Sequence, residues 1–533
     1  MKTASPITSP SPSAFPAVWL RDNCPCPECR DPRNDQKLFG VTDLDPRIEV
    51  VEIDGTTVTF SDGHVVRFDP AWLAAHALDG TVPDDRAEDA KRLWAVLPPP
   101  EGSWSRCLSD PSHLLECLDT VLHTGFVLLR GVPAEPGRVL EVAAVLGYVR
   151  ETNYGRLFDV RVEATPVNLA FTGLPIGPHT DNPYRDPVPT VQLLHCLSNA
   201  VAGGESGFVD GFHAAALLRA EDPAAFELLA RTPVTFRYGD ANTELTATRP
   251  MIGLDPLGRI REVRFNNRSL RPVRLPYERT EAFYAAYRAF AEILARPGLQ
   301  VNVRLGPGDC VVFDNTRILH ARTGFAETGE RHLQGCYADL DGLAGNLAVL
   351  RRRQAVVEHL RELFEGPGAA DYLGEEVTQA AHMLQTAACA VRDGAAPGLV
   401  AAALLHDVGH FTGEITGHDL MGGTDNRHSH VGADWLGRWF GPEVTEPVRL
   451  HVAAKRYLCA VESSYYDLLS EASRYTLGVQ GGPMGAEEVA GFEAEPYARD
   501  AVRLRRWDDE AKEPGRVVAG FDEYAALLHR LVR

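Results

Sequence analysis

The 533-residue sequence has no apolar run that approaches the roughly 20 residues needed to span a bilayer as a helix. Its N-terminal stretch, MKTASPITSPSPSAFPAVW, lacks the apolar core of a signal peptide, so we expect a flexible leader over residues 1–18 and a cytoplasmic protein. Positive charge is in deficit, because the formal net charge is −20. This deficit argues against nucleic acid and anionic membranes as main partners, but it leaves room for a basic pocket that binds a small anion. The sequence also has no internal repeat.

The pattern of apolar residues divides the chain into three regions, as expected for a length above the about 100–200 residues of one domain. Residues 19–98 contain short strand-like runs such as RIEVVEIDGTTVTF and end at the stiff LPPPEG break. In residues 99–345, runs such as TVQLLHCL and CVVFDN alternate with turns, which predicts a β-rich barrel. Residues 350–533 have helical periodicity and predict an all-α domain, with the junction expected in DLDGLAGNL, residues 339–347.

Three cysteines are gathered in the segment WLRDNCPCPECRD. In a cytoplasmic protein Cys24, Cys26 and Cys29 are expected to be reduced, so their close spacing indicates metal binding first. Three such thiols suit a tetrahedral zinc ion, and His64 in FSDGHVVRF is the best candidate for the fourth ligand. A closed set of four ligands would be structural rather than catalytic. The alternative is that these cysteines are ordinary buried thiols.

A second candidate metal site begins in GPHTDNPY. His179 and Asp181 form an H-x-D pair, whose spacing places both side chains on one face of a strand. His320 in DNTRILHARTGF is the candidate for a distal third ligand. Two histidines and one carboxylate form the ligand set of iron(II) oxygenases that bind 2-oxoglutarate and dioxygen at the open positions. An H-x-D pair alone is a weak signal, because it often occurs by chance.

The surroundings of this pair resemble those in the γ-butyrobetaine and trimethyllysine hydroxylases. The shared motifs are PHTDNPYRDP, QLLHC, GGESGFVDGF, RFNN, DNTRILHAR and RHLQGCYADLD, with WLRDNC and DGH in the N-terminal region. The resemblance implies a double-stranded β-helix (jelly-roll) oxygenase domain after a small zinc-binding N-terminal domain and, as in several members, a homodimer. It also implies that Arg331, eleven residues after His320, binds the distal carboxylate of 2-oxoglutarate, assisted by the hydroxyl of Ser206.

The same resemblance suggests where the substrate binds. Members of this family hold a trimethylammonium group in an aromatic cage by cation–π attraction. On that basis Tyr337 occupies a cage position, and Tyr184 and Tyr154 are neighbouring candidates. Asn266 or Asn267 in RFNN is expected to contact the substrate. The alternative for any single tyrosine is ordinary packing.

The segment LLHDVGHFTG contains an adjacent histidine and aspartate at the end of an apolar helical stretch. Adjacent ligands can serve two metal ions when the carboxylate bridges them. Four histidines and two aspartates of the C-terminal region are enough for a dinuclear centre. They are His382, His406, Asp407, His428, His451 and Asp508. The alternative, that these are unrelated solvated or hydrogen-bonded residues, must account for all six at once.

This region resembles the HD-domain, mixed-valent di-iron oxygenases of the PhnZ and TmpB type, which cleave carbon–phosphorus bonds. The shared motifs are DYLGEEVTQAAHMLQTA, LLHDVGH, DNRHSHVGADWL, HVAAKRYL, LGVQGGPM and RWDDEAK. The resemblance implies an Fe(II)/Fe(III) pair bridged by Asp407. One iron would also be held by His382, His406 and Asp508, and the other by His428 and His451.

The resemblance further assigns substrate contacts in the HD region. His410 and Lys455 each follow a ligand histidine by four residues on one helical face, and both would contact a phosphonate. Tyr372 and Glu375 match a mobile lid over the site. The alternative for Lys455 is a solvated helix lysine.

The two resemblances together predict a bifunctional enzyme. The first domain would hydroxylate the carbon next to phosphorus in 2-(trimethylammonio)ethylphosphonate or 2-aminoethylphosphonate. The second would cleave the C–P bond of the 1-hydroxy product, giving phosphate and glycine betaine or glycine. Two alternatives remain open: a betaine or trimethyllysine hydroxylase fused to an HD phosphohydrolase, or the same hydroxylase fused to a non-catalytic, nucleotide-sensing HD module.

Overall fold

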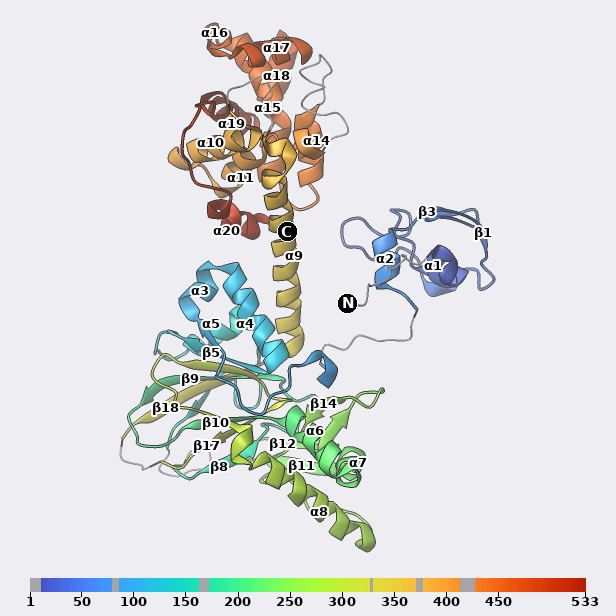
Figure 1. The fold of residues 1–533 in the computed structure, drawn as a ribbon, viewed down its shortest axis with the longest axis vertical. Coiled ribbons are helices and arrows are strands. Elements are labelled where there is room, and N and C mark those ends of the chain that lie inside the picture. The colour runs from blue at the N-terminus through green and yellow to red at the C-terminus, as the bar shows by residue number, and fades with distance from the viewer. Residues whose placement is uncertain (1–10, 79–85, 163–171, 326–328, 371–376, 413–426) are drawn as a thin grey trace, which may run out of the picture. The chain divides into compact units, whose positions relative to one another are not determined.

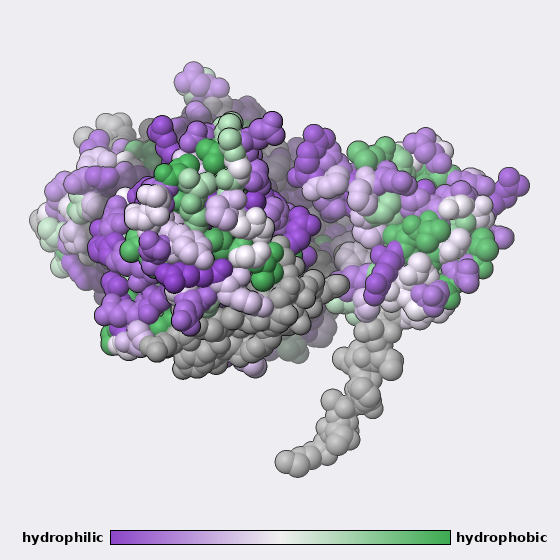
Figure 2. Space-filling model, turned by 90° about the horizontal axis from the view of Figure 1, so that it is seen from above, coloured by the Kyte–Doolittle hydropathy of each residue, from purple (hydrophilic) through white to green (hydrophobic). Residues whose placement is uncertain are grey.

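The computed structural model describes residues 11–78, 86–162, 172–325, 329–370, 377–412 and 427–533. The chain forms two compact units, Met1–Asp84 and Asp85–Arg533 (Figure 1). No described helix is both long enough and apolar enough to cross a membrane. The face drawn in Figure 2 is mostly hydrophilic, in keeping with the net charge of −20.

The N-terminal unit is a three-stranded antiparallel sheet with two short helices. The sheet has the order β1–β2–β3, and the turn between β1 and β2 contains Gly55 at a φ of 58°, which glycine adopts without strain. Leu20, Val58 and Phe60 are among the buried side chains of its core. The elements are α1 (Ala17–Asp22), β1 (Val50–Asp54), β2 (Thr57–Phe60), β3 (Val65–Arg67) and α2 (Pro70–Ala75).

Two facing sheets form the centre of the second unit, and the predicted β-rich barrel corresponds to them. Apolar side chains from both sheets share one core, in which Phe126 and Phe313 of the larger sheet meet Phe208 of the smaller sheet. The larger sheet contains β4 (Glu101–Ser103), β5 (Phe126–Arg130), β16 (Cys310–Asp314), β9 (Val191–Asn199), β18 (Arg331–Ala338) and β6 (Val149–Arg150), with β7 (Phe158–Val160) also paired to β18. The smaller sheet runs β15 (Gln300–Val303), β10 (Ser206–Asp210), β17 (Ile318–Arg322), β8 (Ile176–His179).

Helices and two β-hairpins flank these sheets. One apolar cluster joins α3 (Trp104–Ser109), α4 (Pro111–Thr124) and α5 (Arg138–Leu146) to the outer side of the larger sheet. A second cluster is built from three helices and two hairpins. These are α6 (Gly211–Glu221), α7 (Pro223–Arg231), α8 (Tyr277–Leu294), β11 (Val234–Gly239) with β12 (Glu244–Arg249), and β13 (Ile252–Leu254) with β14 (Ile260–Val263).

In the described residues, the C-terminal part of the unit is helical, as predicted. Its core includes all the residues from Leu399 to Leu405, which are buried because α11 is apolar on every side. The helices are α9 (Leu340–Glu365), α10 (Gln379–Arg392), α11 (Pro397–Leu405), α12 (Gly409–Thr412), α14 (His428–Leu436), α15 (Pro442–Val461), α16 (Tyr465–Leu468), α17 (Glu471–Val479), α18 (Ala486–Glu493), α19 (Ala498–Glu510) and α20 (Asp522–Leu531).

The junction expected at residues 339–347 is not a break in the chain. Helix α9 runs through it without interruption (Figure 1). Leu343 and Leu347 of this helix belong to the core of the oxygenase part, whereas Val357 and Leu360 belong to the core of the HD part. The helix is therefore an element of both cores, because its apolar positions continue at helical spacing past the glycines of DGLAG.

Two other predicted boundaries are also displaced. Phe15 is buried and stacks on Trp19 with a ring-centroid distance of 4.6 Å, so the leader predicted for residues 1–18 is too long. The N-terminal domain predicted for residues 19–98 corresponds to a compact unit that ends at Asp84. Residues beyond it pack on the oxygenase: Trp94 donates from Nε1 to the Thr124 carbonyl over 2.7 Å, and Glu88 pairs with Arg219 at 2.8 Å.

Candidate active sites

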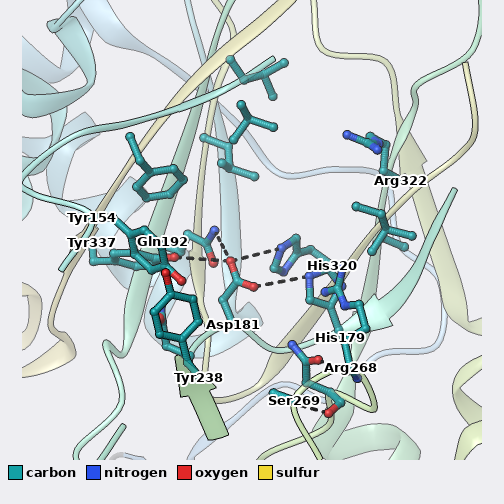
Figure 3. A pocket seen from close by; sticks show the side chains of 18 of the residues that line it. Tyr154, His179, Asp181, Gln192, Tyr238, Arg268, Ser269, His320, Arg322 and Tyr337 are labelled. Atoms are coloured by element: carbon teal, nitrogen blue, oxygen red, sulfur yellow. Dashed lines mark hydrogen bonds and ion pairs between the residues drawn. The ribbon is translucent and has the colours of Figure 1, made fainter. Parts of the chain in front are cut away.

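Two neighbouring strands of the smaller sheet bring the first predicted ligand set together (Figure 3). His179 ends β8 and lies opposite His320 of β17, and Asp181 follows two residues after His179. Nε2 of His179 is 3.4 Å from Asp181 Oδ1, and Nε2 of His320 is 3.8 Å from Oδ2. Two imidazole nitrogens and one carboxylate therefore face a common point, which fits the two-histidine, one-carboxylate set of iron(II).

The electrostatics of this set also fit a metal. Burial alone would raise the pKa of the Asp181 carboxyl, but His179 and His320 hold that pKa well below its usual range. Burial, together with the charge of His179, lowers the pKa of His320 to about 3. The site thus offers an ionised carboxylate and a neutral imidazole at neutral pH, which are the forms that bind metal ions.

Arg331 and Ser206, predicted to bind 2-oxoglutarate, line the same cavity, which has a volume of about 480 Å³. Arg331 is only 6% exposed, and its guanidinium donates to the Gly204 carbonyl over 3.2 Å and lies over the ring of Phe325. No carboxylate of the described residues is among the groups that shift its pKa, and burial lowers that pKa. A buried cation with no anionic partner is unfavourable, so this position fits an anionic ligand.

A second buried guanidinium, which the sequence reasoning missed, lies in this cavity. Arg322 stands two residues after His320 and donates to the carbonyls of Thr172 and Leu174. Burial, together with the charges of Arg331 and Arg268, lowers the pKa of Arg322 to about 10. Arg322 follows His320 by two residues in β17, so both side chains lie on the same face of the strand. This spacing could have predicted that Arg322 lies near the metal site.

The three predicted cage tyrosines line the other part of the cavity, together with two aromatic residues that were not predicted. The hydroxyls of Tyr154 and Tyr184 are 2.8 Å apart. Tyr238 stacks on Tyr184 at 5.2 Å and meets Tyr154 edge-on at 5.7 Å. Phe158 stacks on Tyr337 at 5.1 Å. No motif marked Tyr238 or Phe158, because hairpin β11–β12 and strand β7 reach the cavity only through the fold.

Of the two asparagines of RFNN that were candidates for substrate contact, one lines the cavity. Asn266 is buried and lines the cavity, whereas Asn267 is exposed and is not part of the lining. The reason is that Asn266 turns inward and donates from Nδ2 to the Thr180 carbonyl over 3.1 Å. Arg268, which was not predicted, lines the cavity near Asp181 and Tyr184, whose charges raise its pKa while burial lowers it more.

The second predicted ligand set is brought together by four helices and the residues that follow α11. Asp407 lies between two groups of histidines. Its Oδ2 is 3.5 Å from His406 Nε2 and 3.8 Å from His382 Nε2. Its Oδ1 is 3.6 Å from Nε2 of both His428 and His451. One carboxylate thus presents a different oxygen to each group, which is the arrangement of a bridging ligand.

Asp508 completes the first group, because its Oδ1 is 3.3 Å from His382 Nε2. Backbone carbonyls orient the rings: Nδ1 of His382 faces Ala511 O at 2.8 Å, and Nδ1 of His451 faces Val448 O at 2.7 Å. A carbonyl only accepts, so each Nδ1 carries the proton and each Nε2 keeps its lone pair for a metal. Burial also lowers the pKa of His451 to about 4, which keeps that imidazole neutral.

A small cationic cavity of about 80 Å³ adjoins these ligands, as defined by the described residues. Lys455 Nζ donates to Thr476 Oγ1 over 3.0 Å, and Lys512 Nζ donates to Ser473 Oγ over 2.9 Å. Thr476 and Ser473 stand three residues apart on α17, so one helix face orients both ammonium groups. Lys455 is 3% exposed, and burial together with Arg505 lowers its pKa to about 7.

Of the other residues predicted to contact the phosphonate, only His410 lies within the described residues. His410 lines the cavity, stacks on His428 at 4.1 Å and lies 3.9 Å from Asp407 Oδ1. Tyr372 and Glu375, predicted as a lid, lie outside the described residues. Lys512, Ser473 and Thr476 were not predicted, although Lys512 belongs to the motif RWDDEAK.

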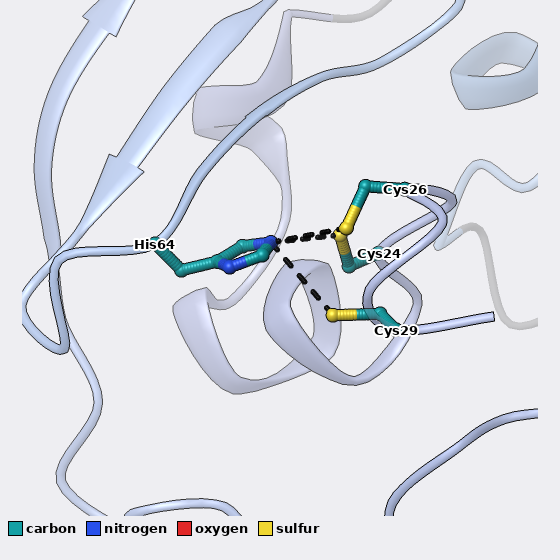
Figure 4. Close-up of side chains that lie close together, drawn as sticks. All are labelled: Cys24, Cys26, Cys29 and His64. Atoms are coloured by element: carbon teal, nitrogen blue, oxygen red, sulfur yellow. Dashed lines mark hydrogen bonds between the residues drawn. The ribbon is translucent and has the colours of Figure 1, made fainter.

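The predicted zinc ligands converge in the N-terminal unit (Figure 4). Nε2 of His64 lies 3.2, 3.4 and 3.7 Å from the sulfurs of Cys24, Cys26 and Cys29, respectively. Arg21 donates to Cys29 Sγ over 3.2 Å, an arrangement that favours a thiolate. The four ligand atoms face one point and leave no side open for a substrate, which fits a closed structural site.

A further group of possible ligands, Cys107, His113 and Cys117, is less suited to a metal. The two sulfurs are 3.8 Å apart, and His113 Nε2 is 3.8 Å from Cys117 Sγ. However, that nitrogen already accepts the backbone N–H of Ser103 over 2.9 Å. Its lone pair is therefore in use, and we interpret the group as packing.

Family models match three separate parts of the chain. Residues 98–337 match the taurine catabolism dioxygenase TauD, TfdA family, and residues 9–74 match the gamma-butyrobetaine hydroxylase-like N-terminal family. Residues 380–480 match the HD domain family. These matches agree with a multidomain chain in which an oxygenase is fused to an HD domain.

Curated relatives match the first two thirds of the chain. The gamma-butyrobetaine dioxygenase of Pseudomonas sp. (strain AK-1) is 40% identical over 349 residues, which cover 64% of this chain and 91% of that protein. The gamma-butyrobetaine dioxygenase of Homo sapiens is 32% identical over 362 residues, which cover 64% of this chain and 92% of that protein. The trimethyllysine dioxygenase of Bos taurus is 29% identical over 351 residues, covering 63% and 82%.

Proposed function

The chain belongs to the γ-butyrobetaine dioxygenase family of iron(II)- and 2-oxoglutarate-dependent oxygenases, and on this premise we propose that it is a bifunctional enzyme of organophosphonate degradation. The oxygenase domain would replace a hydrogen on the carbon next to phosphorus by a hydroxyl group. Dioxygen and 2-oxoglutarate are consumed in this step, and succinate and carbon dioxide are released. The HD domain would then use a second dioxygen to cleave the C–P bond.

In the first site His179, Asp181 and His320 would hold iron(II), which supplies the activation of dioxygen. Arg331 would bind the distal carboxylate of 2-oxoglutarate through its buried guanidinium, with Ser206 as a second donor. The cavity of about 480 Å³ has room for this co-substrate and a small substrate side by side.

The remaining groups of the cavity support a substrate with a cationic and an anionic end. Tyr154, Tyr184 and Tyr238 offer ring faces to an ammonium group. Arg268 lines the cavity and could bind an oxyanion there. A guanidinium can bind two oxygens of a phosphonate at once. Both 2-(trimethylammonio)ethylphosphonate and 2-aminoethylphosphonate combine these ends, as carboxylate betaines also do, and the ring faces favour the quaternary ammonium of the former phosphonate.

The observation that carries the proposal for the HD domain is the position of Asp407, one oxygen toward each group of histidines. His382, His406 and Asp508 would hold one iron, and His428 and His451 the other, with Asp407 between them. A mixed-valent Fe(II)/Fe(III) pair would supply oxidative chemistry at the hydroxylated carbon.

The cationic cavity beside these ligands supports a phosphonate as the group that binds there. Lys455, Lys512 and His410 would contact its oxygens, with the two lysines held in place by hydroxyls of α17. In the overall reaction, the C–P bond and the adjacent C–H bond break. One oxygen atom of dioxygen ends in the carboxylate of glycine betaine or glycine, the other ends in phosphate, and one proton is released.

An HD phosphohydrolase or a nucleotide sensor is the alternative function for this domain. The cavity of about 80 Å³ among the described residues suits a small anionic group such as a phosphonate. In the N-terminal unit, Cys24, Cys26, Cys29 and His64 would hold zinc in a structural role.

Phosphorus NMR of the full-length, iron(II)-loaded enzyme with 2-oxoglutarate, ascorbate and air tests the proposal. Each phosphonate is offered separately. Conversion of one to inorganic phosphate, dependent on 2-oxoglutarate, is the expected result. A shifted phosphonate signal without phosphate would restrict the function to hydroxylation. Unchanged phosphonates, together with oxygen-independent hydrolysis of phosphate esters, would overturn the proposal in favour of a betaine hydroxylase fused to a phosphohydrolase.

A further inference from the structure

A buried amide holds Oδ2 of the Asp181 carboxylate, the oxygen that also lies 3.8 Å from His320 Nε2 (Figure 3). Gln192 Nε2 donates to Asp181 Oδ2 over 3.0 Å, and the hydroxyl of Tyr337 lies 3.4 Å from the same oxygen. Gln192 and Tyr337 are paired across strands β9 and β18, so both side chains project from the same face of the larger sheet. The other oxygen, Oδ1, is the one that lies 3.4 Å from His179 Nε2.

We propose that Gln192 is a positioning residue that fixes the rotation of the Asp181 carboxylate toward the metal. The inference rests on the assignment of His179, Asp181 and His320 as iron ligands. The carboxylate cannot rotate without losing the hydrogen bond from Gln192 to Oδ2. A carboxylate that rotated freely would present its oxygens to the metal less precisely.

The orientation of the amide supports a role for its donor end. Gln192 is 1% exposed, and its Oε1 is buried without a hydrogen-bond partner in the described structure. Turning the amide over would place Oε1 against the carboxylate, so that two acceptors would face each other. The negative charge of Asp181 therefore determines that Nε2 of Gln192 faces the carboxylate, although Oε1 is left without a hydrogen-bond partner in the described structure.

The residue after Asp181, Asn182, is also in an energetically unfavourable state. Asn182 has a φ of 56°, in the left-handed region that side chains other than glycine rarely adopt. Both polar atoms of its amide are buried without a partner in the described structure. Strain and unpaired polar groups next to a ligand residue indicate that the segment is shaped for the metal site rather than for its own stability.

The test compares full-length Gln192→Met, which removes the donor but keeps the length, with the wild type. Gln334→Met is the matched control, because Gln334 is also a buried glutamine of the larger sheet but bonds Asp159 instead of a metal ligand. Iron(II) is titrated anaerobically at saturating 2-oxoglutarate, and the charge-transfer absorption of the iron(II)·2-oxoglutarate complex is followed. Only the oxygenase site forms this complex, so the HD site does not contribute.

We expect Gln192→Met to weaken iron(II) binding by about 10- to 100-fold and to alter the absorption band, as loss of such outer contacts does. Succinate formed per substrate hydroxylated should rise, with little change in the substrate KM. Gln334→Met should retain the wild-type band. If Gln192→Met fails to fold, Gln192→Glu keeps the shape and should weaken iron(II) binding through repulsion between two carboxylates.

The inference would be overturned if folded Gln192 variants kept the wild-type iron(II) affinity, the wild-type absorption band and the wild-type ratio of succinate to hydroxylated product. Losses of the same size in Gln334→Met would also overturn it. Failure of the underlying site assignment gives a different result. In that case the wild type itself would form no charge-transfer complex with iron(II) and 2-oxoglutarate.

Discussion

Arg505 Nη1 donates to Oδ2 of Asp508 over 2.7 Å, while Oδ1 of the same carboxylate lies 3.3 Å from His382 Nε2. Gln192 likewise donates to Oδ2 of Asp181 in the oxygenase domain, where Oδ1 lies 3.4 Å from His179 Nε2 and Oδ2 lies 3.8 Å from His320 Nε2. In both candidate sites, a buried donor holds one oxygen of a carboxylate that faces the predicted ligand histidines. The protein thereby sets the orientation of the ligand before a metal binds.

We predict that Arg505→Met weakens iron binding in the HD domain by about 10- to 100-fold, because Asp508 loses the donor that orients it. Phosphate release from a chemically prepared 1-hydroxyphosphonate should fall accordingly. Turnover of 2-oxoglutarate by the first domain should not change. Iron content per chain and phosphate release measure the effect, and full iron content with full phosphate release would contradict the prediction.

Arg331→Met should raise the KM for 2-oxoglutarate by about 10- to 150-fold, since a hydrogen bond to a charged group contributes about 1.5–3 kcal/mol. The expectation follows from the burial of Arg331 without an ion pair among the described residues. Arg304→Met is the control, because Arg304 bonds the nearby carbonyls of Gly203 and Val201 but does not line the cavity. Equal effects of the two substitutions on KM would count against the assignment.

Asp407→Ala and His179→Ala should inactivate different half-reactions. Asp407→Ala removes the carboxylate between the two groups of histidines, so it should abolish phosphate formation but leave hydroxylation intact. His179→Ala should abolish succinate formation and leave cleavage of a supplied 1-hydroxyphosphonate intact. Succinate and phosphate are measured separately for each variant. Loss of both activities in either folded variant would show that the two sites do not work independently.

Lys455→Met should raise the thermal stability of the HD domain while weakening binding of the 1-hydroxyphosphonate. Burial and Arg505 lower the pKa of Lys455 to about 7, whereas a lysine in an unfolded chain titrates at about 10.4. Between these values the unfolded chain binds a proton that the folded domain does not, so stability rises with pH. The destabilisation by Lys455 is therefore complete below pH 7 and small at pH 10.

Calorimetry of the full-length protein at pH 7 and pH 10 checks this prediction. The gain in melting temperature from Lys455→Met should be larger at pH 7. Arg456→Met on the same helix should show no such pH-dependent gain, because Arg456 bonds Gly482 and Glu488 at the domain surface. An equal gain in melting temperature at both pH values would contradict the prediction. It would mean that the charge of Lys455 does not destabilise the folded domain.

Parts of this architecture could be predicted because particular chemistry requires particular side chains. The change from strand-like to helical periodicity separates the oxygenase from the HD domain, and the structure has that division. The boundaries were predicted less well. Proline-rich LPPPEG suggested a border, but Trp94 before it packs on the oxygenase through hydrogen bonds to Thr124 and Asp210. The glycines of DGLAG suggested a break, but α9 passes through them because its apolar positions are buried on both sides.

The sequence by itself determined which side chains could serve as ligands: the H-x-D pair with His320, the HD pair with its distant histidines, and the CPCPEC cluster. Their spacing and residue types carry that information locally. Only the tertiary structure decided which oxygen of Asp407 faces which histidines, and that Gln192, Arg268 and Tyr238 reach the same cavity. These relationships depend on strand register and helix packing between segments far apart in the chain, and no local pattern of residues specifies them.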